Sequence, residues 1–219
     1  MAGSVAREGE LAADENAEVV QRLIAAGAVI IGRTNMTEFA YSGLGINPHY
    51  GTPLNPYDRA TGRIPGGSSS GAAVSVADGM AVAGIGSDTG GSVRIPAALC
   101  GLTGFKPSAW RVSMTGVLPL SANLDSIGPI AASVRCCAEL DAILSGDGGP
   151  VPEALPLRGL RLAVPTTLAL DAMEKHVADT FAATVARLKE AGALVDEIAI
   201  PEFAELGNIN SKGGFTAAE

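Results

Sequence analysis

The stretch GGSSSGAAVSVADGMAVAGIGSDTGGSVRIPA, residues 66–97, decides how this chain folds. It opens with the Gly/Ser-rich turn GGSSSG (66–71) and reaches a second such turn, DTGGSVR (88–94), after the small apolar run MAVAGIGS (80–87). Glycines let a backbone turn sharply with its amides exposed, which creates a nest for an anion or an oxyanion. We therefore expect a helix over 68–76, a buried strand over 80–87 and a candidate catalytic turn on either side of them.

Helix and strand patterns alternate on both sides of this stretch, which favours an α/β fold with a mixed β-sheet core flanked by helices. The expected helices cover residues 14–26, 36–42, 133–144 and 171–191, and the expected strands cover 28–32, 161–165 and 193–200, with short strands and turns in 102–108 and 112–120. Residues 42–67 have neither period and contain repeated Gly, Pro and Asn, so they predict a long loop, a feature that is usually functional or mobile.

The composition of the 219 residues excludes several classes of protein. The formal charge is −8 with a pI of about 4.8, and the 15 basic residues are scattered, which argues against a nucleic-acid surface. No apolar run is long enough to span a membrane. The three cysteines form neither a disulfide framework nor a metal motif, and MAGSVAREGE (1–10) lacks a signal-peptide core, so we expect a cytoplasmic protein without a metal or cofactor.

A serine in one of the two turns is a candidate nucleophile, although such turns also occur as plain turns. The phosphate-binding motifs GxxxxGK[ST] and GxGxxG are absent, and so is the esterase motif GxSxG. His49 lies in the long loop and His176 on the polar face of an expected helix, where histidines are usually solvated. A serine nucleophile here therefore needs a base other than histidine. We expect Asp88 and Arg94 to pair and hold the second turn; the alternative is that Arg94 faces an anionic substrate.

Residues 66–97 resemble the signature of the amidase signature family. The resemblance extends through AGAVIIGRTNMTEFAYSGLGINPHYGTPLNP (26–56), LCGLTGFKPS (99–108) and GVLPLSANLDSIGPIAAS (116–133), and so covers most of residues 10–145. It implies a partial amidase-signature fold, with residues 1–219 forming a single incomplete amidase domain.

The resemblance also implies a Ser–cis-Ser–Lys triad that hydrolyses the C–N bond of a small-molecule amide. Ser92 takes the place of the nucleophile and Ser68 that of the bridging serine, preceded by a cis peptide bond after Gly67. The oxyanion hole is implied for the backbone N–H groups of Thr89, Gly90, Gly91 and Ser92. In this mechanism a neutral lysine takes a proton from Ser68, while Ser68 takes one from Ser92.

The family carries that lysine on an early strand, in a segment like VKDN, ahead of a segment like TTAGS. The lysines of this chain are Lys106, Lys175, Lys189 and Lys212, which all follow both serines and do not match that position. We therefore expect a central fragment of an amidase that is inactive alone. The alternatives are a non-catalytic remnant that pairs with another chain, for example as a homodimer, and an A-type subunit of an amidotransferase.

Overall fold

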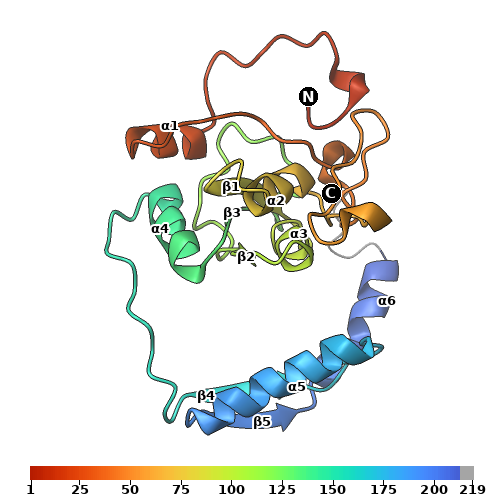
Figure 1. Ribbon diagram of the computed structural model, residues 1–219, viewed down its shortest axis with the longest axis vertical. Coiled ribbons are helices and arrows are strands. Elements are labelled where there is room, and N and C mark those ends of the chain that lie inside the picture. Colours follow the sequence, from red (N-terminus) through yellow and green to blue (C-terminus); the bar gives the residue numbers. More distant parts are fainter. Residues whose placement is uncertain (213–219) are drawn as a thin grey trace. The chain divides into compact units, whose positions relative to one another are not determined.

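A computed structural model describes residues 1–212 of the chain. These residues divide into two compact units, unit 1 over residues 1–152 and unit 2 from residue 153 onward. Figure 1 labels the elements of both. The interpretation of residues 1–219 as one incomplete domain stays a prediction.

Unit 1 is built on an antiparallel sheet in the order β1-β3-β2. Its strands are β1 (Ala83–Asp88), β2 (Thr103–Gly104) and β3 (Ser126–Ala131). β1 pairs with the whole of β3, whereas β2 pairs only with the last two residues of β3. β1 is therefore an edge strand of this sheet.

Helices cover both faces of the sheet in unit 1 (Figure 1). Because side chains alternate across a strand, Ile127 and Ile130 of β3 face opposite sides. Ile130 packs with Ala72 and Ala97, which belong to α2 (Ser70–Ala77) and α3 (Arg94–Leu99). Ile127 packs in a second cluster with residues of α1 (Glu18–Ala25) and α4 (Val134–Ser145). These two small apolar layers form the core and fix the sheet between them.

The long loop at 42–67 is confirmed; it contains only the short 3-10 turn η3 (Arg59–Thr61). Two buried asparagines order it. The Asn47 side chain donates to the carbonyls of Gly3 and Met36, both at 2.8 Å, while its oxygen accepts from the two amides that follow in the loop. The Asn55 side chain donates to the carbonyls of Ile64 and Leu99, at 3.3 and 2.9 Å. Buried polar groups need partners, so these contacts fix the path of the loop.

The strand expected at 28–32 is wrong in this structure. The run is not assigned to a strand, and Val29 and Ile31 are 83% and 68% exposed. In the described residues, the backbone of 29–34 makes no hydrogen bond to another part of the main chain. Apolar β-branched residues form a strand only where a neighbouring strand supplies hydrogen bonds, and here none is present.

Two further expectations need correction. Residues 112–120 contain no strand, and the helix expected at 36–42 is reduced to the 3-10 turn η2 (Glu38–Ala40). Phe39 and Ala40 have positive φ angles, which an α-helix does not allow. Conversely, β3 is a strand that the sequence pattern does not predict, although all six of its residues are buried.

Unit 2 follows the sequence pattern closely. β4 (Arg161–Pro165) pairs in parallel with β5 (Leu194–Ile198), and α5 (Lys175–Glu190) connects them. The unit ends with η4 (Pro201–Glu205) and α6 (Leu206–Ser211). Both antiparallel and parallel pairs therefore occur in the chain, in separate sheets. Among the described residues, no helix is long and apolar enough to cross a membrane.

Candidate active site

The two Gly/Ser-rich turns lie side by side in unit 1. The Ser69 amide donates to the carbonyl of Ser92 at 3.2 Å, which ties the first turn directly to the second. The close approach depends on Gly86 of β1, because a Cβ at that position would lie 2.4 Å from the Ser69 hydroxyl oxygen. The fold thus joins two segments that the sequence separates by a helix and a strand.

The first turn is held in place by the segment that follows residue 34. The Gly67 amide donates to the carbonyl of Gly43 at 2.8 Å, and the Thr37 amide donates to the carbonyl of Ser68 at 3.1 Å. The peptide bond between Gly67 and Ser68 is cis, as expected. Ser68 is fully buried, and among the described residues its hydroxyl has no hydrogen-bond partner. Ser92 is 8% exposed.

The second turn is organised around the buried carboxylate of Asp88. Its oxygens accept from the amides of Gly91 and Val93, at 2.7 and 3.1 Å, and from the guanidinium of Arg94, at 2.9 and 3.0 Å. Burial alone would raise the pKa of Asp88, but the hydrogen bonds from Arg94 and from the two amides outweigh it and lower that pKa below its ordinary value. Asp88 is therefore an anionic anchor for the turn, and its expected pairing with Arg94 is confirmed.

The amides of the second turn differ in what they contact. In the part of the chain that the structure describes, the N–H groups of Thr89, Gly90 and Ser92 donate to no protein acceptor. The Gly91 N–H is already engaged by Asp88, which does not match its expected place in the oxyanion hole. Gly91 has a φ of +128°, which L side chains rarely adopt, so this position of the turn favours glycine.

Asp125 completes this site and was missed in the sequence. Its carboxylate accepts from the Thr89 hydroxyl and from the amides of Leu120 and Ser121, the latter at 2.8 and 3.1 Å. It thereby connects the nest to the start of β3. The sequence held one signal for it, an acidic residue directly before the apolar run SIGPIA (126–131), because a carboxylate next to a buried segment needs hydrogen-bond donors.

A groove of about 520 Å³ lies beside the first turn, and Ser69 and Asp125 line it, whereas Ser68 and Ser92 are not among its lining residues. The lining includes Ile85–Ser87 of β1 and residues 34–36, which follow directly on the exposed run at 29–34. Phe39, Tyr41 and the segment 117–120 also line the groove, as do Met1, Ala2 and Arg7 near the N-terminus.

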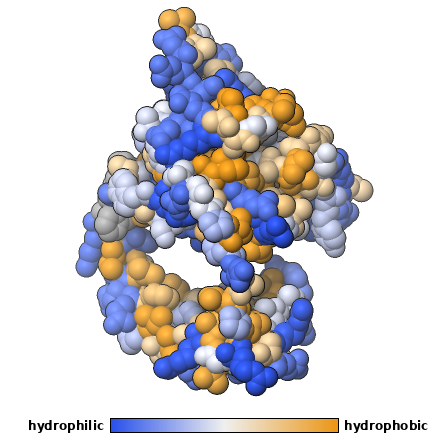
Figure 2. Space-filling view, turned by 90° about the vertical axis from the view of Figure 1, so that its left-hand side faces the viewer, coloured by the Kyte–Doolittle hydropathy of each residue, from blue (hydrophilic) through white to orange (hydrophobic). Residues whose placement is uncertain are grey.

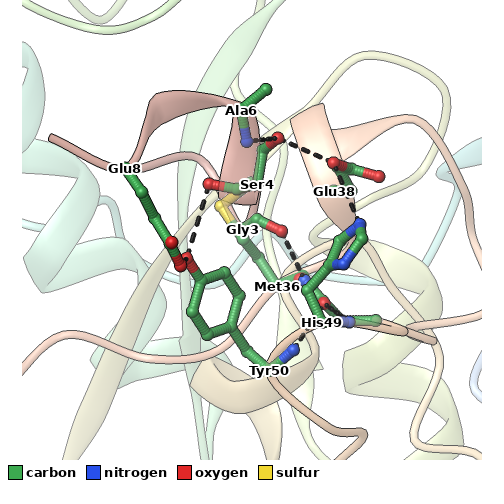
Figure 3. A network of polar contacts seen from close by, with 9 residues as sticks. Gly3, Ser4, Ala6, Glu8, Met36, Glu38, His49 and Tyr50 are labelled. Carbon is green, nitrogen blue, oxygen red and sulfur yellow. Dashed lines mark hydrogen bonds and ion pairs between the residues drawn. The ribbon is translucent and has the colours of Figure 1, made fainter. Parts of the chain in front are cut away.

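A polar network attaches the N-terminal turn to the wall of this groove (Figure 3). Ser4 of this turn, which precedes η1 (Val5–Arg7), donates to Glu38 at 2.7 Å, and Glu38 lies 3.5 Å from His49. The Tyr50 hydroxyl donates to Glu8 at 2.9 Å. Burial, followed by the hydrogen bond to Glu8, raises the pKa of Tyr50. His49 therefore contacts a structural carboxylate and not either candidate serine.

Comparison with known proteins identifies the family. The Amidase family model matches residues 1–218. The chain belongs to the Amidase family. Its sequence is 39% identical over 203 residues to a 2-amino-5-chloromuconic acid deaminase of Comamonas testosteroni, covering 92% of this chain and 44% of that protein. It is 40% identical to the A-type subunit of the glutamyl-tRNA(Gln) amidotransferase of Chloroflexus aggregans, covering 85% of this chain and 40% of that protein.

The fold agrees with this membership. A crystal structure of an amidase superimposes with a TM-score of 0.82 and 39% identity, over 92% of this chain and 45% of that one. The expected amidase-signature fold is thus confirmed as a partial one, because the chain spans less than half the length of the relatives it matches.

Three further residues that the sequence offered as candidate bases in this Amidase family member make polar contacts only with neighbouring residues in the described part of the chain. Lys106 donates to the carbonyl of Pro107 at 2.7 Å, Lys175 pairs with Asp179 at 2.5 Å, and His176 is exposed beside Glu174. Burial raises the pKa of Cys100 to about 11, so this thiol stays protonated at neutral pH.

Proposed function

We propose that this chain is the central part of an amidase that hydrolyses a carboxamide C–N bond through an acyl-enzyme on Ser92. The observation that carries the proposal is the direct contact between the two serine turns, in which the Ser69 amide binds the Ser92 carbonyl. This contact places the buried Ser68 beside a turn with unpaired amides. A nucleophilic serine needs both a proton acceptor and oxyanion donors in its neighbourhood.

In the proposed mechanism, a neutral lysine accepts the proton of the Ser68 hydroxyl while Ser68 accepts that of Ser92. The Ser92 oxygen then attacks the amide carbonyl, and the oxyanion that forms accepts from the free amides of the nest. Collapse of this intermediate breaks the C–N bond, and the leaving nitrogen takes the proton held by the lysine. Water, deprotonated along the same route, releases the acid and restores Ser92.

The nest has donors for that oxyanion without the Gly91 amide. We assign the role to the N–H groups of Thr89, Gly90 and Ser92, which have no protein acceptor in the described chain. Removal of one such donor typically lowers the rate about 100- to 1000-fold. Asp125 has a positioning role in this scheme, because it binds the Thr89 hydroxyl.

The lysine base has to come from outside these residues, because none of the four lysines matches the family position. Its pKa, ordinarily about 10.4, has to be lowered by burial for the neutral form to be present near pH 7. The chain alone is accordingly expected to be inactive.

A fluorophosphonate probe, which reacts with activated serines, tests this proposal. We expect labelling in a version of the chain extended upstream with a lysine-bearing strand of the family type, and none in the chain as given. Ser92→Ala should abolish labelling in the extended form. Ser75→Ala is the matched control, because Ser75 lies on α2 and its hydroxyl donates to the carbonyl of Ala72 in the same helix. If the extended protein folds and Ser92 stays unlabelled, the assigned nucleophile is wrong.

A second candidate function is that of an amidotransferase A-type subunit, favoured by the 40% identity to the Chloroflexus protein. The two functions differ in the acceptor, which is water for a hydrolase and a second substrate for a transferase. Release of free acid from a carboxamide by the extended protein alone supports the hydrolase, whereas a requirement for another protein supports the transferase.

We also propose a cytoplasmic location and a small-molecule amide as substrate. The free thiols of Cys100, Cys136 and Cys137 support a reducing compartment. Pairing of two copies is proposed for the chain as given, since it presents an unpaired sheet edge. Light scattering of the purified protein tests the pairing of two copies, and a fluorescent fusion in cells tests the location.

A further inference from the structure

Unit 1 contains a second cavity, of about 400 Å³, which is lined by none of the residues of the two serine turns. Residues of β2, of α4 and of the segment 147–152, which follows α4, line it. Its apolar lining comes from Phe105, Val134, Ala138, Ala142, Pro150 and Pro152. Its volume lies in the range of small-molecule sites, about 300–1,000 Å³.

The charged part of the lining consists of two carboxylates and one guanidinium. Arg111 donates to a single oxygen of Asp141, Oδ2, through Nε at 2.9 Å and through Nη2 at 2.8 Å. Its remaining nitrogen, Nη1, lies 2.6 Å from Asp147 Oδ2. Because one guanidinium faces two carboxylates, this cluster of Arg111, Asp141 and Asp147 holds one negative charge in excess.

The carboxylate of Asp141 has one oxygen without a donor. Asp141 is 7% exposed, and among the residues that the structure describes its Oδ1 atom has no hydrogen-bond partner. Burial of a carboxylate oxygen is costly without a donor, because the ionised group loses its hydration. The cavity therefore presents a buried acceptor as well as an excess of negative charge.

The end of α4 adds to this preference for a positive charge. The unpaired carbonyls at a helix C-terminus carry partial negative charge, and the last turn of α4 contains no basic residue. Arg22 of α1 donates to the carbonyl of Leu144 at this end, but Arg22 pairs with Glu18 and does not line the cavity.

We propose that this cavity binds a small organic cation, with an ammonium group at Asp141 and an apolar body against the apolar lining. An ammonium group has three donors and one positive charge, so it supplies both the donor that Oδ1 lacks and the charge that the cluster lacks.

Other ligand classes fit the cavity less well. A carboxylate or phosphate would be repelled by the excess negative charge. Calcium takes about six to eight oxygen ligands, and the described residues contain no group of three acidic, cysteine or histidine side chains that could hold a metal ion. A neutral apolar molecule would leave Oδ1 without a donor.

The apolar surface of the cavity continues to the outside of the molecule. Val134 and Phe105, both in the lining, are 74% and 41% exposed. Figure 2 views the molecule from the side on which α4 is drawn in Figure 1, and apolar side chains, in orange, are exposed there among hydrophilic ones. A ligand can therefore bury apolar surface here that water otherwise covers.

The test is isothermal titration calorimetry of the full 219-residue chain with benzylammonium, benzyl alcohol and benzoate. These probes share one apolar ring and differ in charge, which is positive, absent and negative in turn. We expect benzylammonium to bind at least about tenfold more tightly than the other two. In NMR spectra, its addition should shift the amide signals of residues 103–105 and 134–142.

A charge variant tests the role of the buried carboxylate. Asp141→Asn keeps the size of the side chain and removes its charge, so it should weaken benzylammonium binding at least about tenfold and leave benzyl alcohol unchanged. The matched control is Glu139→Gln, because Glu139 is an acid of the same helix that pairs with Arg135 and does not line the cavity. It should bind all three probes as the parent does.

A second variant, Ala138→Leu, fills the cavity with a larger apolar side chain and leaves all charges in place. It should abolish the binding of every probe, and it tests the site even where Asp141→Asn does not fold. Equal affinities for the three probes, or an unchanged affinity for benzylammonium in Asp141→Asn, would overturn the proposal. So would tightest binding of benzoate, binding of none of the probes, or NMR shifts confined to the groove beside the first serine turn.

Discussion

At the scale of single residues, the Asp88 carboxylate determines the shape of the nest. It is buried and accepts hydrogen bonds from two turn amides and from Arg94. In Asp88→Asn, one acceptor oxygen becomes an NH₂ group that faces N–H donors, whichever way the amide is oriented. We expect a loss of about 1–3 kcal/mol in the free energy of unfolding, measured by urea denaturation. Asp14→Asn, at an exposed acid, should change it by less than about 0.5 kcal/mol.

The same carboxylate predicts a pH dependence. The pKa of Asp88 is lowered in the folded protein, so its contribution to stability is present above the unfolded carboxyl pKa, about 3.9, and is lost as the pH falls through the lowered folded value. Denaturation of the parent chain should therefore become easier as the pH falls below about 4. Asp88→Asn should reduce this dependence, and an identical pH profile in parent and variant would contradict the assignment.

Gly86 is the residue that permits the two serine turns to touch. A methyl group in Gly86→Ala would lie 2.4 Å from the Ser69 hydroxyl and 2.8 Å from its Cβ, so the first turn has to move. Overpacking of this kind typically costs about 1–3 kcal/mol. We expect that loss in thermal denaturation and a loss of Ser92 labelling in the extended protein. Gly149→Ala, where a Cβ meets nothing within 4 Å, is the control and should keep both.

At the scale of elements, the sequence predicted local structure well and pairing poorly. β4 and the two turns could be recognised because residues 161–165 and the Gly/Ser clusters carry their own signals. β3 could not, because Pro129 within it argues against a central strand. The Pro129 carbonyl accepts from the Phe105 amide at 3.1 Å, one residue beyond the end of β2. Because the N–H and C=O of a strand residue point to the same side, the N–H that proline lacks is not needed for the pairing of β3 with β1. The strand expected at 28–32 is absent for the opposite reason, because strand composition without a partner does not make a strand.

The candidate site shows the same division. Ser68 and Ser92 were identified through the resemblance, and their turns do meet in the structure, while their catalytic roles stay proposals. Asp125 and the engagement of the Gly91 amide depend on contacts between distant segments. Such contacts leave no periodic signal in one sequence.

The long loop is an element whose order depends on Asn47. In Asn47→Ala, the amides of His49 and Tyr50 and the carbonyls of Gly3 and Met36 lose their partner. We expect the loop at 42–67 to become the first site of limited proteolysis, with a cleavage rate at least about tenfold higher. Asn208→Ala, which removes an exposed contact in unit 2, should leave the cleavage pattern unchanged. Equal cleavage of parent and Asn47→Ala would show that the loop is ordered by other contacts.

At the scale of the whole molecule, we expect the exposed apolar run 29–34 to govern how copies of the chain associate. Val29 and Ile31 are exposed next to unpaired main-chain groups, a combination that favours aggregation through strand pairing. Replacing both with lysine should change the free energy of unfolding by less than about 0.5 kcal/mol each, because neither side chain is buried.

The same double substitution should sharply reduce the aggregated fraction on concentration, since charged residues on an edge oppose pairing. Static light scattering at matched concentrations measures this, with Val82→Lys as the control, because Val82 is 88% exposed but lies outside the run 29–34. If Val82→Lys suppresses aggregation equally, net charge and not the edge controls association. If neither variant reduces the aggregated fraction, another surface of the chain drives association, and the run 29–34 stays exposed without promoting it.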